Sequence, residues 1–159
     1  MLKKIVSGGQ TGVDFGSLLA AKEFGLQTGG YAPQGWHTED GPRPDLKDFG
    51  LIECVDPGYP ARTWANVRIA DLTIWIGDIN TAGYRCTDEA AVSLGKPLWA
   101  SIAKLGETSV DDLAKNLHTK AVEVLNVAGN RESKNPGIEE RTRLFLLEVF
   151  RQLRELGGC

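Results

Sequence analysis

The sequence predicts an α/β fold: a Rossmann-like, three-layer domain with a mostly parallel sheet and helices on both faces. Two observations lead to this prediction. Short apolar segments alternate with helical segments along the whole chain, and strands joined by helices form parallel sheets through right-handed crossovers. The first apolar segment also runs directly into a glycine-rich turn, residues 8–12. A length of 159 residues suits one domain, 1–159, with one core.

The first element is a strand at residues 2–7, which ends in the glycine turn. A helix is expected to start at Val13, because the apolar spacing becomes helical there, and to stop at Gly25. Thr11 is the candidate N-cap of this helix, with Asp14 three residues later. Both residues could instead contact a ligand.

The remaining elements continue the alternation. Short apolar runs bounded by turn residues predict five more strands, at residues 26–31, 49–54, 72–77, 97–102 and 121–127. Helical spacing predicts further helices at residues 62–70, 87–94, 110–117 and 138–156. The last helix has the clearest apolar stripe, formed by Leu144, Leu147, Phe150 and Leu153. Residues 32–48 hold three prolines and are expected to form a long loop, which in a compact domain is often functional.

Composition and charge exclude several classes of function. The apolar share of 42% and the charged share of 25% are average for a globular protein, so neither disorder nor a membrane role is indicated. No apolar run approaches the roughly twenty residues that span a bilayer. The net charge of −3 gives no general attraction to nucleic acid. The three cysteines form neither a zinc pattern nor a disulfide framework, which favours a reducing, cytoplasmic compartment.

Three loops follow the ends of predicted strands: residues 7–12, 78–87 and 128–137. The carboxyl ends of parallel strands lie at one edge of a sheet, where ligands bind, so these loops are expected to converge. The first loop contains Gly8, Gly9 and Gly12, which are expected to leave backbone N–H groups uncovered. These groups would lie at the positive end of a helix, so the loop is predicted to bind phosphate. Close packing of strand on helix is the alternative reason for these glycines.

Polar side chains in the same loops could complete a ligand site. Gln10 and Thr11 could hydrogen-bond a ligand, although Thr11 could equally cap the helix. Arg131 and Ser133 offer a guanidinium and a hydroxyl, a combination suited to an anion. The guanidinium could instead pair with a nearby acid, Glu132 or Glu139.

Aromatic and cysteine residues give weaker signals. Tyr31 and Trp36, near the long loop, could stack on a flat heterocycle, whereas Trp75 and Trp99 lie in predicted strands and are expected in the core. Cys86 stands at a predicted helix start, where a thiolate is favoured. A small buried residue without a catalytic role is the expectation for it.

Several blocks of sequence, taken in order, resemble the molybdenum cofactor carrier proteins. They are residues 7–14 (SGGQTGVD), 30–35 (GYAPQG), 39–42 (EDGP), 62–63 (RT) with 66–67 (NV), and 126–129 (NVAG) with 131–133 (RES). The resemblance covers nearly the whole chain. That family belongs with Rossmann-like proteins that include the lysine-decarboxylase-like "Lonely Guy" phosphoribohydrolases.

The resemblance implies a carrier, not an enzyme. Its cargo would be molybdenum cofactor, a pterin with a terminal phosphate and a dithiolene-held oxo-metal, protected until transfer to acceptor molybdoenzymes. A homo-oligomer, dimer or tetramer, is also implied, with no catalytic residue and no metal ligand from the chain. The candidate cofactor-binding residues are Gly8, Gly9, Gln10, Thr11, Gly12, Asp14, Gly83, Thr87, Arg131 and Ser133. Asn130 stands where relatives often have proline, which puts the rigidity of its loop in question.

Two alternative functions stay open. Phosphoribohydrolases typically carry Pro-Gly-Gly-x-Gly-Thr-x-x-Glu, whose final glutamate serves hydrolysis of the glycosidic bond. The corresponding stretch, residues 80–89, lacks that glutamate in either register. An enzyme acting on a nucleoside monophosphate would therefore rely on Glu89 or Asp14, with Arg131 as electrophile. A nucleotide-sensing module would use the same pocket to bind a phosphorylated ligand without metal.

Overall fold

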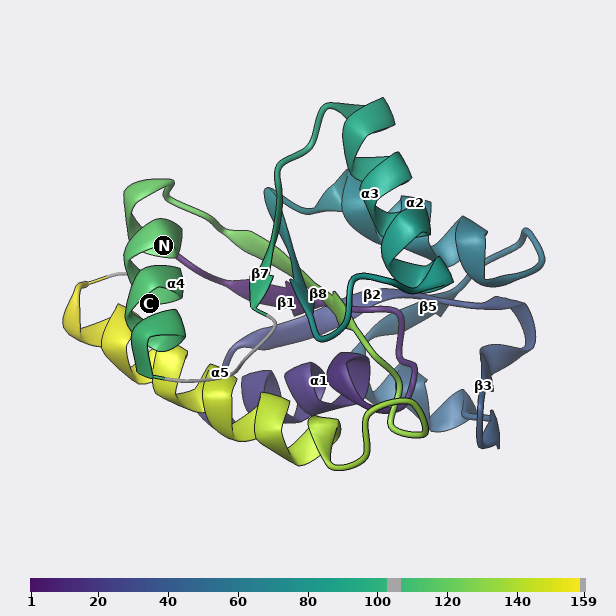
Figure 1. Ribbon diagram of the computed structural model, residues 1–159. Coiled ribbons are helices and arrows are strands. Elements are labelled where there is room, and N and C mark those ends of the chain that lie inside the picture. The colour runs from purple at the N-terminus through teal and green to yellow at the C-terminus, as the bar shows by residue number, and fades with distance from the viewer. Residues whose placement is uncertain (103–106, 158–159) are drawn as a thin grey trace.

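The computed structural model describes residues 1–102 and 107–157, and it shows a central sheet between two layers of helices (Figure 1). Six strands form this sheet in the order β5-β2-β1-β8-β6-β7, with each neighbouring pair parallel. The strands are β1 (Lys4–Val6), β2 (Gln27–Ala32), β5 (Leu51–Glu53), β6 (Leu72–Ile76), β7 (Leu98–Ile102) and β8 (Val124–Gly129). The predicted Rossmann-like α/β class is confirmed.

The helices cover both faces of the sheet, as expected. They are α1 (Val13–Phe24), α2 (Tyr59–Ile69), α3 (Ala82–Leu94), α4 (Glu107–Thr119) and α5 (Ile138–Glu155). Helices α2 and α3 pack together on one face, while α5 packs on α1 and α4 on the other (Figure 1). Gly16 permits the close approach of α1 to α5, because a Cβ there would lie 2.3 Å from the carbonyl oxygen of Glu139. In the part of the chain that the structure describes, no helix has the length and apolarity needed to cross a bilayer.

Three element boundaries that bear on the site differ from the prediction. Helix α2 begins at Tyr59 rather than at Arg62. Helix α3 begins at Ala82 rather than at Thr87, because the Thr81 hydroxyl accepts a hydrogen bond from the Tyr84 amide at 3.1 Å and caps the helix. Gly83 therefore lies in the first turn of α3 and not in a loop. Strand β8 continues to Gly129, beyond the predicted end.

The apolar stripe of α5 was predicted with one wrong member. Leu144 is 53% exposed, whereas the helix buries Ile138, Thr142, Phe145, Leu146, Leu147, Val149, Phe150 and Leu153. Residues spaced by three drift around a helix of 3.6 residues per turn, so a series from 144 to 153 does not stay on one face. The residues on the buried face of α5 are instead separated by a mixture of three and four positions along the sequence.

The long segment 32–48 contains short regular elements in place of the predicted irregular loop. Two 3₁₀ turns, Gln34–Trp36 and Pro44–Phe49, flank a small antiparallel hairpin of β3 (His37–Thr38) and β4 (Gly41–Pro42). Trp36 is buried in a cluster with Leu18 and Leu46. Its predicted role as a stacking surface for a ligand is therefore wrong, because its ring belongs to the core.

Candidate functional site

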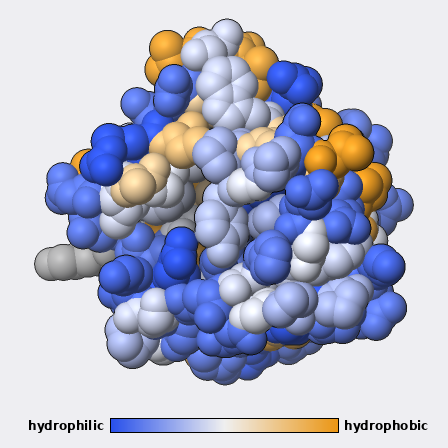
Figure 2. Space-filling model, turned by 90° about the vertical axis from the view of Figure 1, so that its right-hand side faces the viewer, coloured by the Kyte–Doolittle hydropathy of each residue, from blue (hydrophilic) through white to orange (hydrophobic). Residues whose placement is uncertain are grey.

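The three predicted loops converge where the strands end, and they enclose a cavity of about 540 Å³. Its walls come from the β1–α1 turn, helix α2, the end of β6 with the loop that follows it, the start of α3, and the end of β8 with the segment after it. Figure 2 faces the side at which the strands of Figure 1 end, and shows a largely hydrophilic surface with apolar residues gathered toward its upper rim. Of the ten predicted cofactor-binding residues, six line this cavity: Gly8, Gln10, Asp14, Gly83, Thr87 and Arg131.

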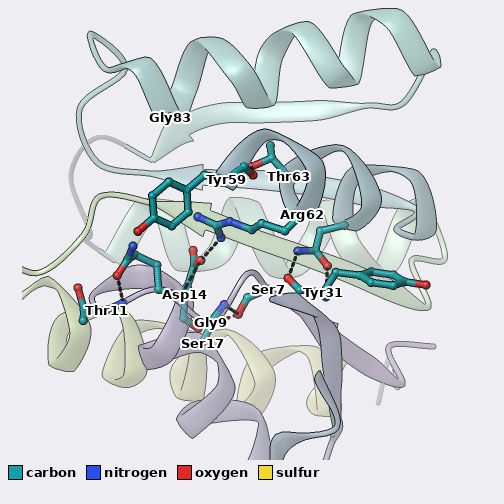
Figure 3. A network of polar contacts seen from close by, with 12 residues as sticks. Ser7, Gly9, Thr11, Asp14, Ser17, Tyr31, Tyr59, Arg62, Thr63 and Gly83 are labelled. Atoms are coloured by element: carbon teal, nitrogen blue, oxygen red, sulfur yellow. Dashed lines mark hydrogen bonds and ion pairs between the residues drawn. The ribbon is translucent and has the colours of Figure 1, made fainter. Parts of the chain in front are cut away.

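The carboxylate of Asp14 occupies the glycine turn. Its Oδ2 accepts hydrogen bonds from the Gln10 amide at 3.2 Å and from Nη1 of Arg62 at 2.7 Å. Figure 3 shows Arg62 reaching from α2 toward this carboxylate. Burial raises the pKa of Asp14, while the Arg62 guanidinium and the amides of Gln10 and Gly8 oppose that rise. A carboxyl group of the chain itself thus occupies the turn in which the sequence predicted an external anion.

The expectation that this turn presents uncovered N–H groups is wrong. Its amides have acceptors within the protein. Gly8 and Gln10 donate to Asp14, Gly9 to Ser7 Oγ, Thr11 to Gln10 Oε1, Gly12 to Glu139, and Val13 to the Asn130 carbonyl. Steric fit explains two of the glycines. A Cβ on Gly9 would lie 2.6 Å from the Leu46 side chain, and one on Gly12 would lie 2.5 Å from the Asn130 carbonyl oxygen. Close packing thus accounts for both glycines, although it is packing against the 3₁₀ turn Pro44–Phe49 and the loop after β8 and not the expected packing of strand on helix.

Two buried donors at the cavity wall have no acceptor among the described residues. Oε1 of Gln10 accepts from the amides of Thr11 at 3.0 Å and Glu39 at 2.9 Å, which fixes the orientation of the side-chain amide. The Nε2 donor of Gln10 therefore has no acceptor among the described residues, and Gln10 is only 5% exposed. Nε of Arg62 is likewise buried without a partner. Both residues line the cavity.

Arg62 and Asn66 entered the sequence analysis only as members of the blocks that resemble the carrier family. Their roles depend on contacts with residues that lie far away in the sequence. Asn66 fixes α2 against the sheet, because its Oδ1 accepts from the Tyr31 amide at 2.8 Å and its Nδ2 donates to the Tyr31 carbonyl at 3.0 Å. Arg62 then lies one helical turn earlier, where it reaches Asp14. The sequence offers no local signal for either pairing.

Glu39 connects two loops of the site. Its carboxylate accepts hydrogen bonds from the hydroxyls of Thr11 and Ser133, and from the Ser133 amide at 3.1 Å. Thr11 and Ser133 are thus joined to each other through Glu39, and neither is among the residues that line the cavity. The predicted N-cap role of Thr11 is also wrong, because Gly12 is the N-cap residue of α1. Sequence reasoning missed the role of Glu39.

The Glu39→Gln variant is expected to lose stability at neutral pH but not in acid. Burial raises the pKa of Glu39, but hydrogen bonds from Ser133 and Thr11 outweigh it and hold the pKa below its ordinary value. A carboxyl with a lowered folded pKa stabilises above its unfolded pKa, and that contribution is lost as the pH falls through the folded pKa. The stabilities of wild type and variant should therefore approach each other between about pH 5 and 3.

Urea unfolding at several pH values measures this difference, and Glu155→Gln, at the exposed end of α5, is the matched control. A gap between wild type and Glu39→Gln that is constant from pH 7 to 3 would contradict the role of the ionised carboxylate.

The loop after β8 leaves Arg131 unpaired. Glu132 accepts from the amides of Gly137 and Glu139, the latter at 3.0 Å, and so caps the start of α5. Neither acid considered above pairs with Arg131, and no carboxylate of residues 1–100 and 110–157 lies within ion-pair distance of its guanidinium. Its charge acts over a longer distance on Glu39, where it helps to lower the pKa. Arg131 is half-buried and lines the cavity together with Lys134.

Asn130 holds this loop in place despite the missing proline. Its Oδ1 accepts from the Asp78 amide at 2.8 Å, which ties the loop after β8 to the loop after β6. A Cβ on Gly77 would lie 2.2 Å from the same oxygen. The side chain is 6% exposed, so the link is buried.

Two of the residues considered for chemistry, Glu89 and Cys86, lie outside the cavity, whereas Asp14 and Arg131 line it. Glu89 is exposed on α3, and Cys86 is half-buried there; neither is among the described residues that line the cavity. Burial raises the pKa of the Cys86 thiol, which disfavours the thiolate. Within the described ranges, no group of three or more His, Cys, Asp or Glu side chains could hold a metal ion.

Comparison with known proteins agrees with this architecture. The model of the circularly permutated YpsA SLOG family matches residues 5–150. A crystal structure named "Putative molybdenum carrier protein", from Syntrophus aciditrophicus SB, is similar with a TM-score of 0.78 and 30% sequence identity, over 96% of this chain and 94% of that one. No protein among the curated sequences matches. The resemblance to molybdenum carriers is confirmed, and the chain belongs to the circularly permutated YpsA SLOG family.

Proposed function

We propose that this protein binds molybdenum cofactor as cargo in the cavity between the β1–α1 turn and α3, and holds it until transfer. The name of the similar structure supports a molybdenum-related cargo. A volume of about 540 Å³ lies within the usual range of small-molecule sites. The residues proposed to contact the cofactor are Gly8, Gln10, Asp14, Gly83, Thr87 and Arg131.

The observation that carries this proposal is the pair of buried donors without acceptors, Gln10 Nε2 and Arg62 Nε. A buried donor left unsatisfied costs about 1–3 kcal/mol, so native proteins seldom retain one without a reason. Because both residues line the cavity, a small shift of their side chains would let a ligand rich in acceptor atoms satisfy both donors. Molybdenum cofactor has phosphate, oxo and ring acceptors, and it fits a wall of donors better than an amine or a cation would.

The charges around the cavity favour an anion. Arg62 and Asp14 form an ion pair at 2.7 Å. The other charged residues that line the cavity are two cations, Arg131 and Lys134, and one acid, Asp78, and none of the three makes an ion pair with a described residue. Guanidinium groups bind phosphate through two parallel N–H donors. We assign the phosphate end of the cofactor to Arg131 on this ground.

The position of the acids supports carriage over hydrolysis. Hydrolysis of a nucleoside monophosphate would need a general acid near the glycosidic bond. Glu89 is exposed away from the cavity walls, and the carboxylate of Asp14 is held by Arg62 and the Gln10 amide. The cavity wall therefore offers no free carboxyl at either position considered for that role.

Transfer adds two further elements to the proposal. We expect the protein to form a homo-oligomer, a dimer or a tetramer, and to hand the cofactor to acceptor molybdoenzymes in the cytoplasm. A carrier has to release its cargo, and a cavity that opens at the edge of the sheet allows release without unfolding.

Equilibrium dialysis tests the function. Purified protein is dialysed against molybdenum cofactor, AMP and inorganic phosphate in parallel, with release of adenine followed in the AMP chamber. Retention of the cofactor in preference to AMP, with no adenine, is expected. Release of adenine would make the protein a hydrolase, and tight AMP binding without release would make it a nucleotide sensor; either result would overturn the proposal.

A further inference from the structure

Tyr59 lies against two arginines that line the cavity. The Cζ atoms of Arg62 and Arg131 lie 5.6 Å and 5.8 Å from the centre of its ring. Both distances are within the range of a cation–π contact. Figure 3 shows the Tyr59 ring beside the Arg62 guanidinium, above Asp14. No sequence pattern singled out this residue.

The two arginines are held very differently. Arg62 is ion-paired with Asp14 at 2.7 Å, and its side chain is 15% exposed. Arg131 makes no ion pair with a described carboxylate, although its charge helps to lower the pKa of Glu39, and its guanidinium lies against the aromatic ring of Tyr59. A long arginine side chain samples many rotamers when nothing restrains it, and it loses that freedom when it binds.

Tyr59 itself stands on a fixed element. It is the first residue of α2, which follows Gly58 at a φ of 87° and carries a proline in its first turn. The ion pair of Arg62 with Asp14 and the two hydrogen bonds of Asn66 to Tyr31 hold this helix to the rest of the fold. The ring is therefore a stable surface against which a side chain from the loop after β8 can rest.

We propose that Tyr59 is a positioning residue, which holds the Arg131 guanidinium at the cavity in readiness for the anionic group of the ligand. The proposal rests on the function proposed above, because it names the residue that prepares the phosphate contact of that site. Preorganisation of this kind raises affinity by removing the ordering cost from the binding step.

A double-mutant cycle tests the proposal through binding of molybdenum cofactor. Tyr59→Leu should weaken binding by about 2- to 30-fold, the range of a cation–π contact, while Tyr59→Phe, which keeps the ring, should bind as wild type does. In an Arg131→Ala background, Tyr59→Leu should have no further effect. An equal loss in both backgrounds would mean that Tyr59 acts independently of Arg131, and the proposal would be wrong.

Tyr31→Leu is the matched control, because Tyr31 is also half-buried and its ring points away from Asp14 and Arg62 in Figure 3. It should leave the affinity unchanged. A loss as large as that of Tyr59→Leu would show a general effect on α2 and would count against the proposal.

An NMR measurement without ligand separates this proposal from the proposed function. The Nε–H signal of Arg131 should be shifted by the ring current of Tyr59 in wild type and in Tyr59→Phe, and should lose that shift in Tyr59→Leu. A signal that is the same in all three proteins would overturn the positioning role even if the cofactor binds. The expected shifts with no cofactor binding would leave the contact intact and overturn the proposed function alone.

Discussion

Replacing Arg62 with methionine is expected to destabilise the protein by about 3–5 kcal/mol, because it leaves the buried carboxylate of Asp14 without its cation. Asp14 is 5% exposed and Arg62 contacts it at 2.7 Å. Burial already raises the pKa of Asp14, and loss of Arg62 should raise it further. A carboxyl with a raised folded pKa gives stability below its unfolded pKa and loses it as the pH rises. The variant should therefore regain stability as the pH is lowered toward about 4.

Two further variants make this result decisive in urea unfolding experiments. Asp14→Asn combined with Arg62→Met removes both charges and should be more stable than Arg62→Met alone. Arg151→Met, which removes an exposed ion pair with Glu148, should change stability by less than about 1 kcal/mol. An Arg62→Met protein no less stable than Arg151→Met would show that the buried pair does not hold the site together.

Replacing Arg131 with alanine is expected to weaken binding of molybdenum cofactor by about 10- to 100-fold without unfolding the protein. A hydrogen bond to a charged group contributes about 1.5–3 kcal/mol, and each 1.4 kcal/mol is tenfold in affinity. Arg131 lies in the loop after β8 and makes no ion pair with any described carboxylate, so its side chain contributes little to the fold. Equilibrium dialysis gives the affinity, and thermal unfolding gives the stability.

Arg68→Ala is the control for this loss, because Arg68 is exposed on α2 and does not line the cavity. It should bind as wild type does. Arg131→Lys should lie between wild type and alanine, since it keeps the charge but not the planar pair of donors. Unchanged affinity in a folded Arg131→Ala protein would remove this residue from the site.

The fold was predictable because its signals are local. Strand β6 is buried at all five positions. It could be predicted because its sequence is a nearly continuous apolar run, which is typical of a central strand in a parallel sheet. The glycine turn after β1 marked one wall of the cavity, since strand, turn and helix follow one another in the sequence. The convergence of three loops followed from the shared edge of parallel strands.

The internal structure of the site was not predictable, because it depends on partners far apart in the chain. The glycine turn was expected to bind an external anion, yet Asp14 fills it with the help of Arg62, 48 residues away. Glu39 joins Thr11 to Ser133 over 28 and 94 residues. The early start of α3 had a local signal, the capping hydroxyl of Thr81, but Gly83 in the first turn obscured it.

The location of molybdenum in a crystal of the complex tests the central claim most directly. Crystals grown with molybdenum cofactor and measured at the molybdenum absorption edge give an anomalous peak at the metal. The peak is expected inside the cavity, with the cofactor phosphate at Arg131 and acceptor atoms facing Gln10 and Arg62. A peak elsewhere on the molecule, with the cavity filled by solvent, would contradict the account.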